Sequence, residues 1–81
     1  MRTDLTLLGR NYCHLCHDME QAVRPIAEEY GVNVELVDVD QHPELEARYD
    51  ELVPVLLWGD EELCHYFLDE ARVRAVLSQI R

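Results

Sequence analysis

Two cysteines three positions apart, Cys13 and Cys16, are the residues of this sequence whose type and spacing most directly allow chemistry. Two thiols so placed can close a small disulfide ring and open it again. The reacting species is the thiolate, which the unpaired N–H groups and positive dipole end of a helix start favour over the thiol. Redox chemistry is therefore the first hypothesis for the chain.

The pair lies between two patterned segments that indicate how it is positioned. An apolar run from Leu5 to Leu8, closed by Gly9, is typical of a strand buried on both faces. Behind the pair, apolar residues recur at steps of three and four, the spacing of one helix face. These residues are Met19, Ala22, Val23, Ile26, Ala27 and Tyr30. Cys13 is therefore expected at a strand-to-helix turn, in or just before the first helical turn.

The remaining patterns predict further strands and helices. Gly31 is a natural end for the first helix, and Pro25 inside it should cause a bend, because proline lacks the N–H of an internal helix bond. Asp69 can cap a last helix, whose apolar face would contain Val73, Val76, Leu77 and Ile80. Before that helix, strands are expected over residues 5–8, 32–39, 55–58 and 61–66, and helices over residues 14–30 and 43–52.

The element order βαβαββα predicts an α/β fold, a four-stranded mixed sheet flanked by helices on both faces. The first two strands should be parallel, because a helix joins them. The last two should form an antiparallel hairpin around Gly59–Asp60, with the strand at 61–66 at an edge. A length of 81 residues predicts one domain, residues 1–81.

Composition and charge narrow the classes of function. A net charge of −10 argues against nucleic acid, whose phosphates would be repelled, and against anionic membrane surfaces. Three cysteines cannot all pair within one chain, so a structural disulfide framework is not expected. No segment has the apolar length of a signal peptide or of a membrane span of roughly 18 residues. We expect a cytoplasmic protein that acts as a monomer.

Four motifs follow one another along the chain: Cys-His-Leu-Cys at residues 13–16, Val-Asp-Val-Asp at 37–40, Val-Pro-Val-Leu at 53–56 and, more loosely, Phe-Leu-Asp at 67–69. Together with the element order they resemble the glutaredoxin group of the thioredoxin superfamily over nearly the whole chain. The chain looks most similar to the small bacterial glutaredoxin-like proteins with a Cys-His-Leu-Cys motif. The resemblance implies a thioredoxin-like fold and a dithiol oxidoreductase that acts on protein or small-molecule disulfides.

The resemblance also implies roles for the cysteines and the Val-Pro pair. Cys13 would be the exposed nucleophile, with a pKa in the range of roughly 3.5–7.5 that helix starts and cations produce. Cys16 would be the more buried resolving thiol. Pro54 would be a cis-proline facing the disulfide, and the backbone N–H and C=O of Val53 would pair with a bound peptide or glutathione as an added strand does.

Further side chains would surround this site if the resemblance holds. Arg10 would steady the thiolate or bind a carboxylate of glutathione, and Tyr12 would form a wall of the groove. Asp69 would be a substrate contact. His14 differs from the residue common in glutaredoxins, and its imidazole, when protonated, would favour the Cys13 thiolate.

The sequence leaves open whether glutathione is a co-substrate. Residues 64–66 stand where glutathione-binding glutaredoxins usually carry two glycines, so their side chains should crowd that ligand. The net charge would also repel glutathione, which is anionic. The expected partners are a disulfide-containing protein or a small thiol, with a reductase or glutathione for recycling, and no bound cofactor is expected.

The Cys13–Cys16 motif also fits other chemistry. A zinc site would need two more ligands besides the two cysteines. Residues 13–17 also match the C-x-x-C-H pattern of haem attachment. We assign no residue as a metal ligand. The chain could instead be a redox-inert domain, a binding module, or a carrier of an iron–sulfur cluster shared between two chains, without turnover. Cys64 is either a buried strand residue or a third thiol near the active site. The candidate zinc ligands are His14, His17, His42, His65 and Cys64.

Overall fold

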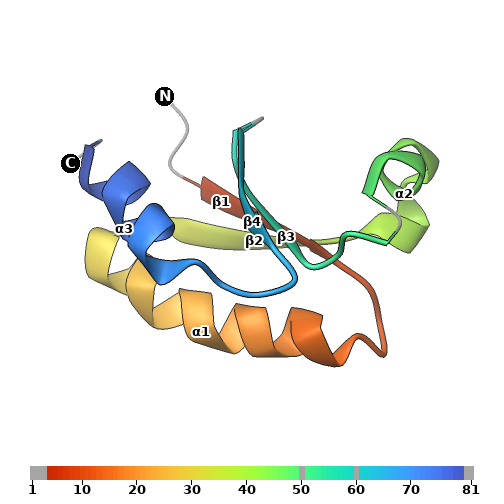
Figure 1. The fold of residues 1–81 in the computed structure, drawn as a ribbon, viewed down its shortest axis with the longest axis horizontal. Helices are drawn as coiled ribbons and strands as arrows, with labels where there is room; N and C mark the ends of the chain where they lie inside the picture. The colour runs from red at the N-terminus through yellow and green to blue at the C-terminus, as the bar shows by residue number, and fades with distance from the viewer. Residues whose placement is uncertain (1–3, 50, 60, 80–81) are drawn as a thin grey trace.

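The structure, a computed structural model, describes residues 4–49, 51–59 and 61–79. Its elements follow the predicted order, with a short 3-10 helix added after the second strand (Figure 1). The strands are β1 (Asp4–Gly9), β2 (Asn33–Asp38), β3 (Val55–Trp58) and β4 (Glu61–His65). The helices are α1 (His14–Tyr30), the 3-10 helix Val39–Gln41, α2 (Pro43–Tyr49) and α3 (Glu70–Gln79).

The strands form one mixed sheet in the order β2-β1-β3-β4. β1 and β2 are parallel, whereas β3 is antiparallel to both β1 and β4. The predicted parallel pair, hairpin and edge strand are confirmed. Because Leu8 of β1 pairs with Val55 of β3, the loop that leaves β1 and the loop that enters β3 lie at the same end of the sheet. That end also holds the start of α1 (Figure 1).

Both faces of the sheet are covered, as predicted. Successive side chains of a strand point to opposite faces, so Leu7 packs in one core cluster and Leu8 in the other. The first cluster joins β1, β3 and β4 to α1 and α3, which lie side by side (Figure 1). The second joins β1 and β3 to Tyr49 of α2. The central strands β1 and β3 are therefore buried on both faces.

Helix α1 begins and ends where the sequence predicts. Cys13 is its N-cap residue, and Gly31 follows it in the left-handed conformation, with φ 69°. The Gly31 N–H bonds to the carbonyls of Ala27 and Glu28, which closes the last turn. The helix continues through Pro25, whose side chain is exposed, so water can bond the carbonyl that proline leaves without a partner. The predicted bend at Pro25 stays a prediction.

The predicted strand over residues 32–39 is one residue too long at each end, since β2 runs from Asn33 to Asp38. The strand ends at Asp38, whose carboxylate accepts a hydrogen bond of 2.9 Å from the Asp40 N–H and starts the 3-10 helix. Val39 is then fully buried in the second core cluster. An alternating pattern cannot show this exit, because a buried valine fits either a strand or the turn that follows it.

The predicted helix over residues 43–52 and strand over residues 61–66 also end early. α2 stops at Tyr49, whose carbonyl accepts the Leu52 N–H in a turn that leads to β3. β4 stops at His65, because Tyr66 has a φ of +65° and cannot continue a strand. Asp60 of the predicted hairpin turn and Ile80 of the predicted apolar face lie outside the described residues.

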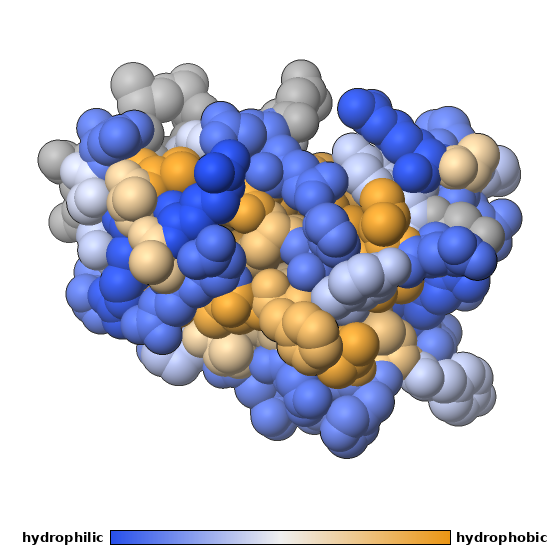
Figure 2. All heavy atoms as spheres, viewed as in Figure 1, coloured by the Kyte–Doolittle hydropathy of each residue, from blue (hydrophilic) through white to orange (hydrophobic). Residues whose placement is uncertain are grey.

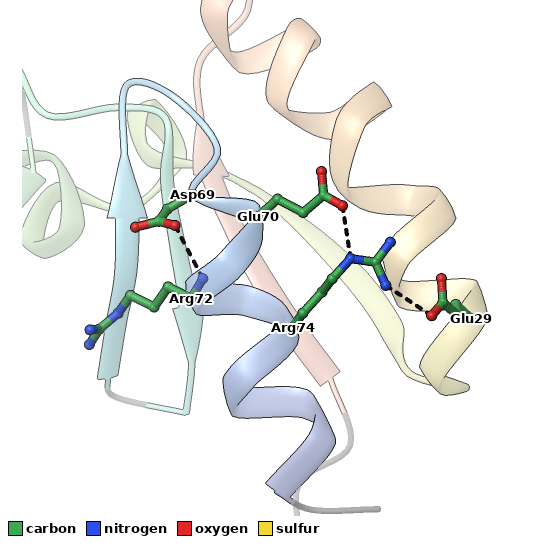
Figure 3. Close-up of polar contacts among 5 residues, drawn as sticks. All are labelled: Glu29, Asp69, Glu70, Arg72 and Arg74. Atoms are coloured by element: carbon green, nitrogen blue, oxygen red, sulfur yellow. Dashed lines mark hydrogen bonds and ion pairs between the residues drawn. The ribbon is translucent and has the colours of Figure 1, made fainter.

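Helix α3 is held by burial and by polar contacts at its ends. The predicted cap is confirmed, since Asp69 Oδ1 accepts the Arg72 N–H at 3.1 Å. Arg74 bonds to Glu70 on its own helix and to Glu29 of α1 at 2.9 Å, which ties α3 to α1 (Figure 3). These ion pairs are exposed, so they contribute little. The burial of apolar side chains holds the helix, and Val73 and Leu77 are the ones fully buried.

Across the ranges given above, none of the helices combines the length and the apolar character that crossing a membrane requires.

Candidate active site

A disulfide joins Cys13 and Cys16 at the start of α1, with 5.2 Å between their Cα atoms. Cys13 is half-buried, whereas Cys16 is only 8% exposed. The N–H of Cys16 donates to Cys13 Sγ at 3.1 Å. The sulfur that a substrate can reach is therefore the one that receives a backbone hydrogen bond at a helix start. The predicted position of Cys13 is confirmed.

Gly9, the last residue of β1, lies directly against the buried sulfur. A Cβ atom at this position would stand 3.1 Å from both Cβ and Sγ of Cys16, closer than side-chain atoms ordinarily approach. The absence of a side chain at Gly9 thus allows the end of β1 to pass next to the disulfide. Sequence reasoning assigned Gly9 only the end of a strand, because nothing in the pattern reports a contact across the fold.

A cavity of about 600 Å³ opens beside the disulfide, between the start of α1 and the adjacent ends of β1 and β2. It brings together five of the eight residues that the resemblance assigns to the site. Those five are Arg10, Tyr12, Cys13, His14 and Cys16, and they are joined by Leu7, Gly9, Asn11, His17, Glu20, Leu36, Val37 and Asp38. We call this space the β2-side cavity.

Arg10 lines the β2-side cavity with its charge shared between two carboxylates. Its Nε lies 3.7 Å from Asp40 Oδ1, and its Nη2 lies 3.9 Å from Glu46 Oε2. Its side chain is about one quarter exposed, with a relative accessibility of 28%. A substrate carboxylate would have to compete with Asp40 and Glu46 for this guanidinium.

Tyr12 and His14 flank Cys13 on the outside. Tyr12 is fully exposed and has a φ of +62°, a conformation that a non-glycine residue adopts at a cost of roughly 1–2 kcal/mol. His14 is also exposed, and its Nε2 lies 3.6 Å from Asp18 Oδ2, one turn further along α1. Both residues line the β2-side cavity. The predicted roles of Tyr12 as a wall of the substrate groove and of His14 in favouring the thiolate stay predictions.

Val53 and Pro54 lie at the same end of the sheet but outside this cavity. The peptide bond between them is cis, and Pro54 is buried. The Pro54 carbonyl accepts the Tyr66 N–H at 2.9 Å. Since Val55 pairs with Leu8, Pro54 precedes β3 at the level where β1 ends. Their role in pairing with a substrate backbone stays a prediction.

Asp69 has a structural role at the start of α3. Its carboxylate caps α3, and it is not among the described residues that line the β2-side cavity. Its predicted role as a substrate contact remains a prediction.

An apolar patch adjoins the disulfide on the side away from β2. Leu15, between the two cysteines, is 36% exposed, and Phe67, in the loop before α3, is 70% exposed. Both line a hollow of about 180 Å³ together with Leu68 and Ala22. Figure 2 shows orange and tan atoms over the region where α1 meets this loop. The disulfide thus lies between the β2-side cavity, which charged residues help to line, and an apolar surface.

Sequence reasoning missed two acidic residues that line the β2-side cavity, Glu20 and Asp38. Glu20 lies one helical turn after Cys16, a spacing that places both on one side of α1. Asp38 ends β2 and pairs with Gly9 at the end of β1. Because parallel strands end at the same edge of a sheet, these two strand ends could have been placed together from the sequence.

Cys64 is a free thiol, half-buried on β4 and packed against the first core cluster. Burial raises the pKa of its thiol, and the carboxylates of Asp69 and Glu62 act in the same direction, while a hydrogen bond from the Asp69 backbone and the charge of Arg72 oppose them. Cys64 is not among the described residues of the β2-side cavity. At neutral pH it should therefore stay protonated.

We expect iodoacetamide to modify the reduced protein at Cys13 well before Cys64. At pH 7 the rate at Cys13 should exceed that at Cys64 by more than about tenfold, because only the thiolate reacts. Peptide mass spectrometry after short exposures would give both rates. In urea the three rates should converge, and preferential labelling of Cys64 in the native protein would contradict the assignment.

Two of the histidines considered as zinc ligands have other side-chain neighbours. His17 Nε2 lies 3.1 Å from Gln21 Nε2, and His65 Nδ1 lies 2.7 Å from Glu62 Oε2. Within the part of the chain that the structure describes, no group of three or more His, Cys, Asp or Glu side chains could hold a metal ion.

Comparison of the chain with protein families and with solved structures finds glutaredoxin-like proteins in both. The family described as Glutaredoxin-like domain (DUF836) matches residues 4–78. A protein from Nitrosomonas europaea, solved by NMR, is 35% identical, with 94% of this chain and 92% of that chain covered and a TM-score of 0.81. NrdH-redoxin from Escherichia coli, described as glutaredoxin-like with a thioredoxin-like activity profile, is 26% identical, with coverages of 96% and 95% and a TM-score of 0.59.

The fold extends to thioredoxins. Thioredoxin 1 from Thermosipho africanus is 18% identical, with coverages of 95% and 92% and a TM-score of 0.66. At that identity the likeness shows the shared fold alone. The fold is thioredoxin-like, as predicted.

Proposed function

The chain belongs to the glutaredoxin-like domain family (DUF836), and on that premise we propose that it is a thiol–disulfide oxidoreductase that cycles Cys13 and Cys16 between dithiol and disulfide. One observation carries this proposal. The disulfide joins a reachable sulfur at a helix start to a buried sulfur one turn behind it, next to an open cavity. A structural disulfide would not need a cavity beside it.

The reaction proceeds by two thiol–disulfide exchanges. The Cys13 thiolate attacks one sulfur of a substrate disulfide, which forms a mixed disulfide and releases the other sulfur as a thiolate. The Cys16 thiolate then attacks Cys13 Sγ, which closes the protein disulfide and releases the second substrate thiolate. Two electrons pass from the protein dithiol to the substrate, and an external thiol or a reductase returns two electrons to the protein.

The backbone around Cys13 supports its role as the attacking sulfur. In the reduced protein, the N–H of Cys16 that donates to Cys13 Sγ would stabilise a thiolate there, as would the positive end of the α1 dipole. Cys16 is buried beneath Gly9, so its thiol meets the mixed disulfide rather than an incoming substrate.

The two surfaces beside the disulfide support action on protein or small-molecule disulfides. The apolar patch at Leu15 and Phe67 would contact a protein substrate, and the backbone at the cis Val53–Pro54 bond would pair with its extended segment. In this proposal the protein is one cytoplasmic domain and acts as a monomer. The similar protein NrdH-redoxin has a thioredoxin-like activity profile, and the proposal accordingly includes recycling of the disulfide by a reductase.

A redox titration tests the proposed function. In a Cys64→Ser background, with thiol buffers of graded potential, the Cys13–Cys16 couple should titrate reversibly with two electrons. Its midpoint should fall between about −120 and −270 mV, the range of thioredoxin-like enzymes. Failure to cycle, or metal held in stoichiometric amount after purification, would overturn the proposal.

A further inference from the structure

Carboxylates surround the β2-side cavity on the strand side. Asp38 lines it directly, and the one guanidinium among its described lining residues, that of Arg10, is placed between Asp40 and Glu46. Two negative charges next to one positive charge leave this side of the cavity negative overall.

The side of the cavity formed by α1 also carries a negative charge. Glu20 lines the cavity and forms an ion pair of 2.9 Å with Arg24, one turn further along α1. His14 also lines it, and its Nε2 lies 3.6 Å from Asp18 Oδ2. Five carboxylates and two guanidinium groups therefore stand at or behind the walls of this cavity.

From this placement we propose that the β2-side cavity binds a positively charged group carried close to the sulfurs of the disulfide substrate, and that it disfavours anionic disulfides such as oxidised glutathione. The inference rests on the proposed function, since it names the substrate class of the same site. The ligand chemistry is an ammonium or guanidinium group, on a small amine disulfide or on a basic side chain next to a cystine.

The volume of the cavity and the negative charge around it both fit an ammonium or guanidinium group. About 600 Å³ lies within the range of small-ligand sites and is larger than one lysine or arginine side chain needs. The net charge of −10 should also attract cationic substrates and repel anionic ones while they are still approaching the protein. Salt screens charges over about 8 Å at physiological ionic strength, so the preference should weaken as salt is added.

Single-turnover exchange with three small disulfides tests the proposal. Reduced Cys64→Ser protein is mixed with cystamine, which is cationic, with 2-hydroxyethyl disulfide, which is neutral, and with oxidised glutathione. Each rate is divided by the rate of the same probe with a free uncharged thiol. After this correction cystamine should react at least about tenfold faster than oxidised glutathione at low salt, and the ratio should fall severalfold at about 0.5 M salt.

Glu20→Gln is the test variant, and Glu28→Gln is its matched control, on the same helix two turns away and not among the described cavity residues. Glu20→Gln should lower the cystamine preference severalfold, whereas Glu28→Gln should leave it unchanged. Equal losses in both variants, or corrected rates that do not depend on probe charge, would overturn the inference. If no probe reacted, including the neutral one, the proposed function itself would fail.

A pair of disulfide peptides separates the two sources of the positive charge. One peptide carries lysines beside the cystine, and the other carries glutamates at the same positions. Faster reduction of the lysine peptide, sensitive to Glu20→Gln, indicates a basic protein segment as the substrate. A preference confined to cystamine indicates a small amine disulfide.

Discussion

Cys13→Ser should lose disulfide exchange by more than about a thousandfold, as removal of an attacking nucleophile commonly does. Cys16→Ser should instead complete the first exchange and stop there, because the buried sulfur that resolves the mixed disulfide is absent. The reduced variants, mixed with a disulfide peptide, would be followed by mass spectrometry. A stable adduct of one peptide half should form with Cys16→Ser and none with Cys13→Ser.

The control for this pair is Cys64→Ser, which should react like the wild type because Cys64 is not among the described residues at the cavity. Near-identical circular dichroism of the three variants would show that folding is not the cause. An adduct on Cys13→Ser, with loss of reaction in Cys16→Ser, would reverse the roles assigned to the two sulfurs.

Gly9→Ala should destabilise the oxidised protein by about 1–3 kcal/mol, the usual cost of adding atoms to a packed contact. The new Cβ would stand 3.1 Å from Cys16 Sγ, and the disulfide holds that sulfur in place. In the reduced protein the thiol can rotate away, so the cost should be smaller. Urea unfolding of both redox forms would measure the difference.

This difference predicts a change in redox potential. A substitution that weakens the oxidised form more than the reduced form makes the midpoint potential less negative. For a two-electron couple about 30 mV corresponds to about 1.4 kcal/mol, so a shift of about 10–30 mV is expected. Gly59→Ala is the control. A Cβ atom there would meet no atom of the described residues within 4 Å, chain neighbours apart, but the φ of +64° makes alanine unfavourable by about 1–2 kcal/mol in either redox form. Equal costs of Gly9→Ala in both forms would contradict the proposed contact.

Local sequence patterns determined much of what could be predicted. The apolar run before Cys13 and the periodic residues after it have the spacings of a strand and a helix, and both spacings belong to the backbone itself. They placed Cys13 at the helix start, where the structure has it. The burial of both faces of β1 and β3 followed from continuous apolar runs for the same reason.

The ends of elements were less well predicted, and here the cause is also physical. The second strand stops at Asp38 because its carboxylate bonds to the Asp40 N–H. The fourth strand stops because Tyr66 takes a positive φ. Each ending depends on one side chain or one backbone angle, which a periodic pattern does not report.

The sequence by itself determined the reactive pair, its place at the start of a helix and the order of strands and helices around it. Only the tertiary structure decided the surroundings of that pair. Gly9 against Cys16, and Arg10 between Asp40 and Glu46, are contacts between segments that the sheet brings together. Such contacts depend on how separate elements pack, so the charge of the cavity, and with it the substrate that we propose, became visible only in the folded chain.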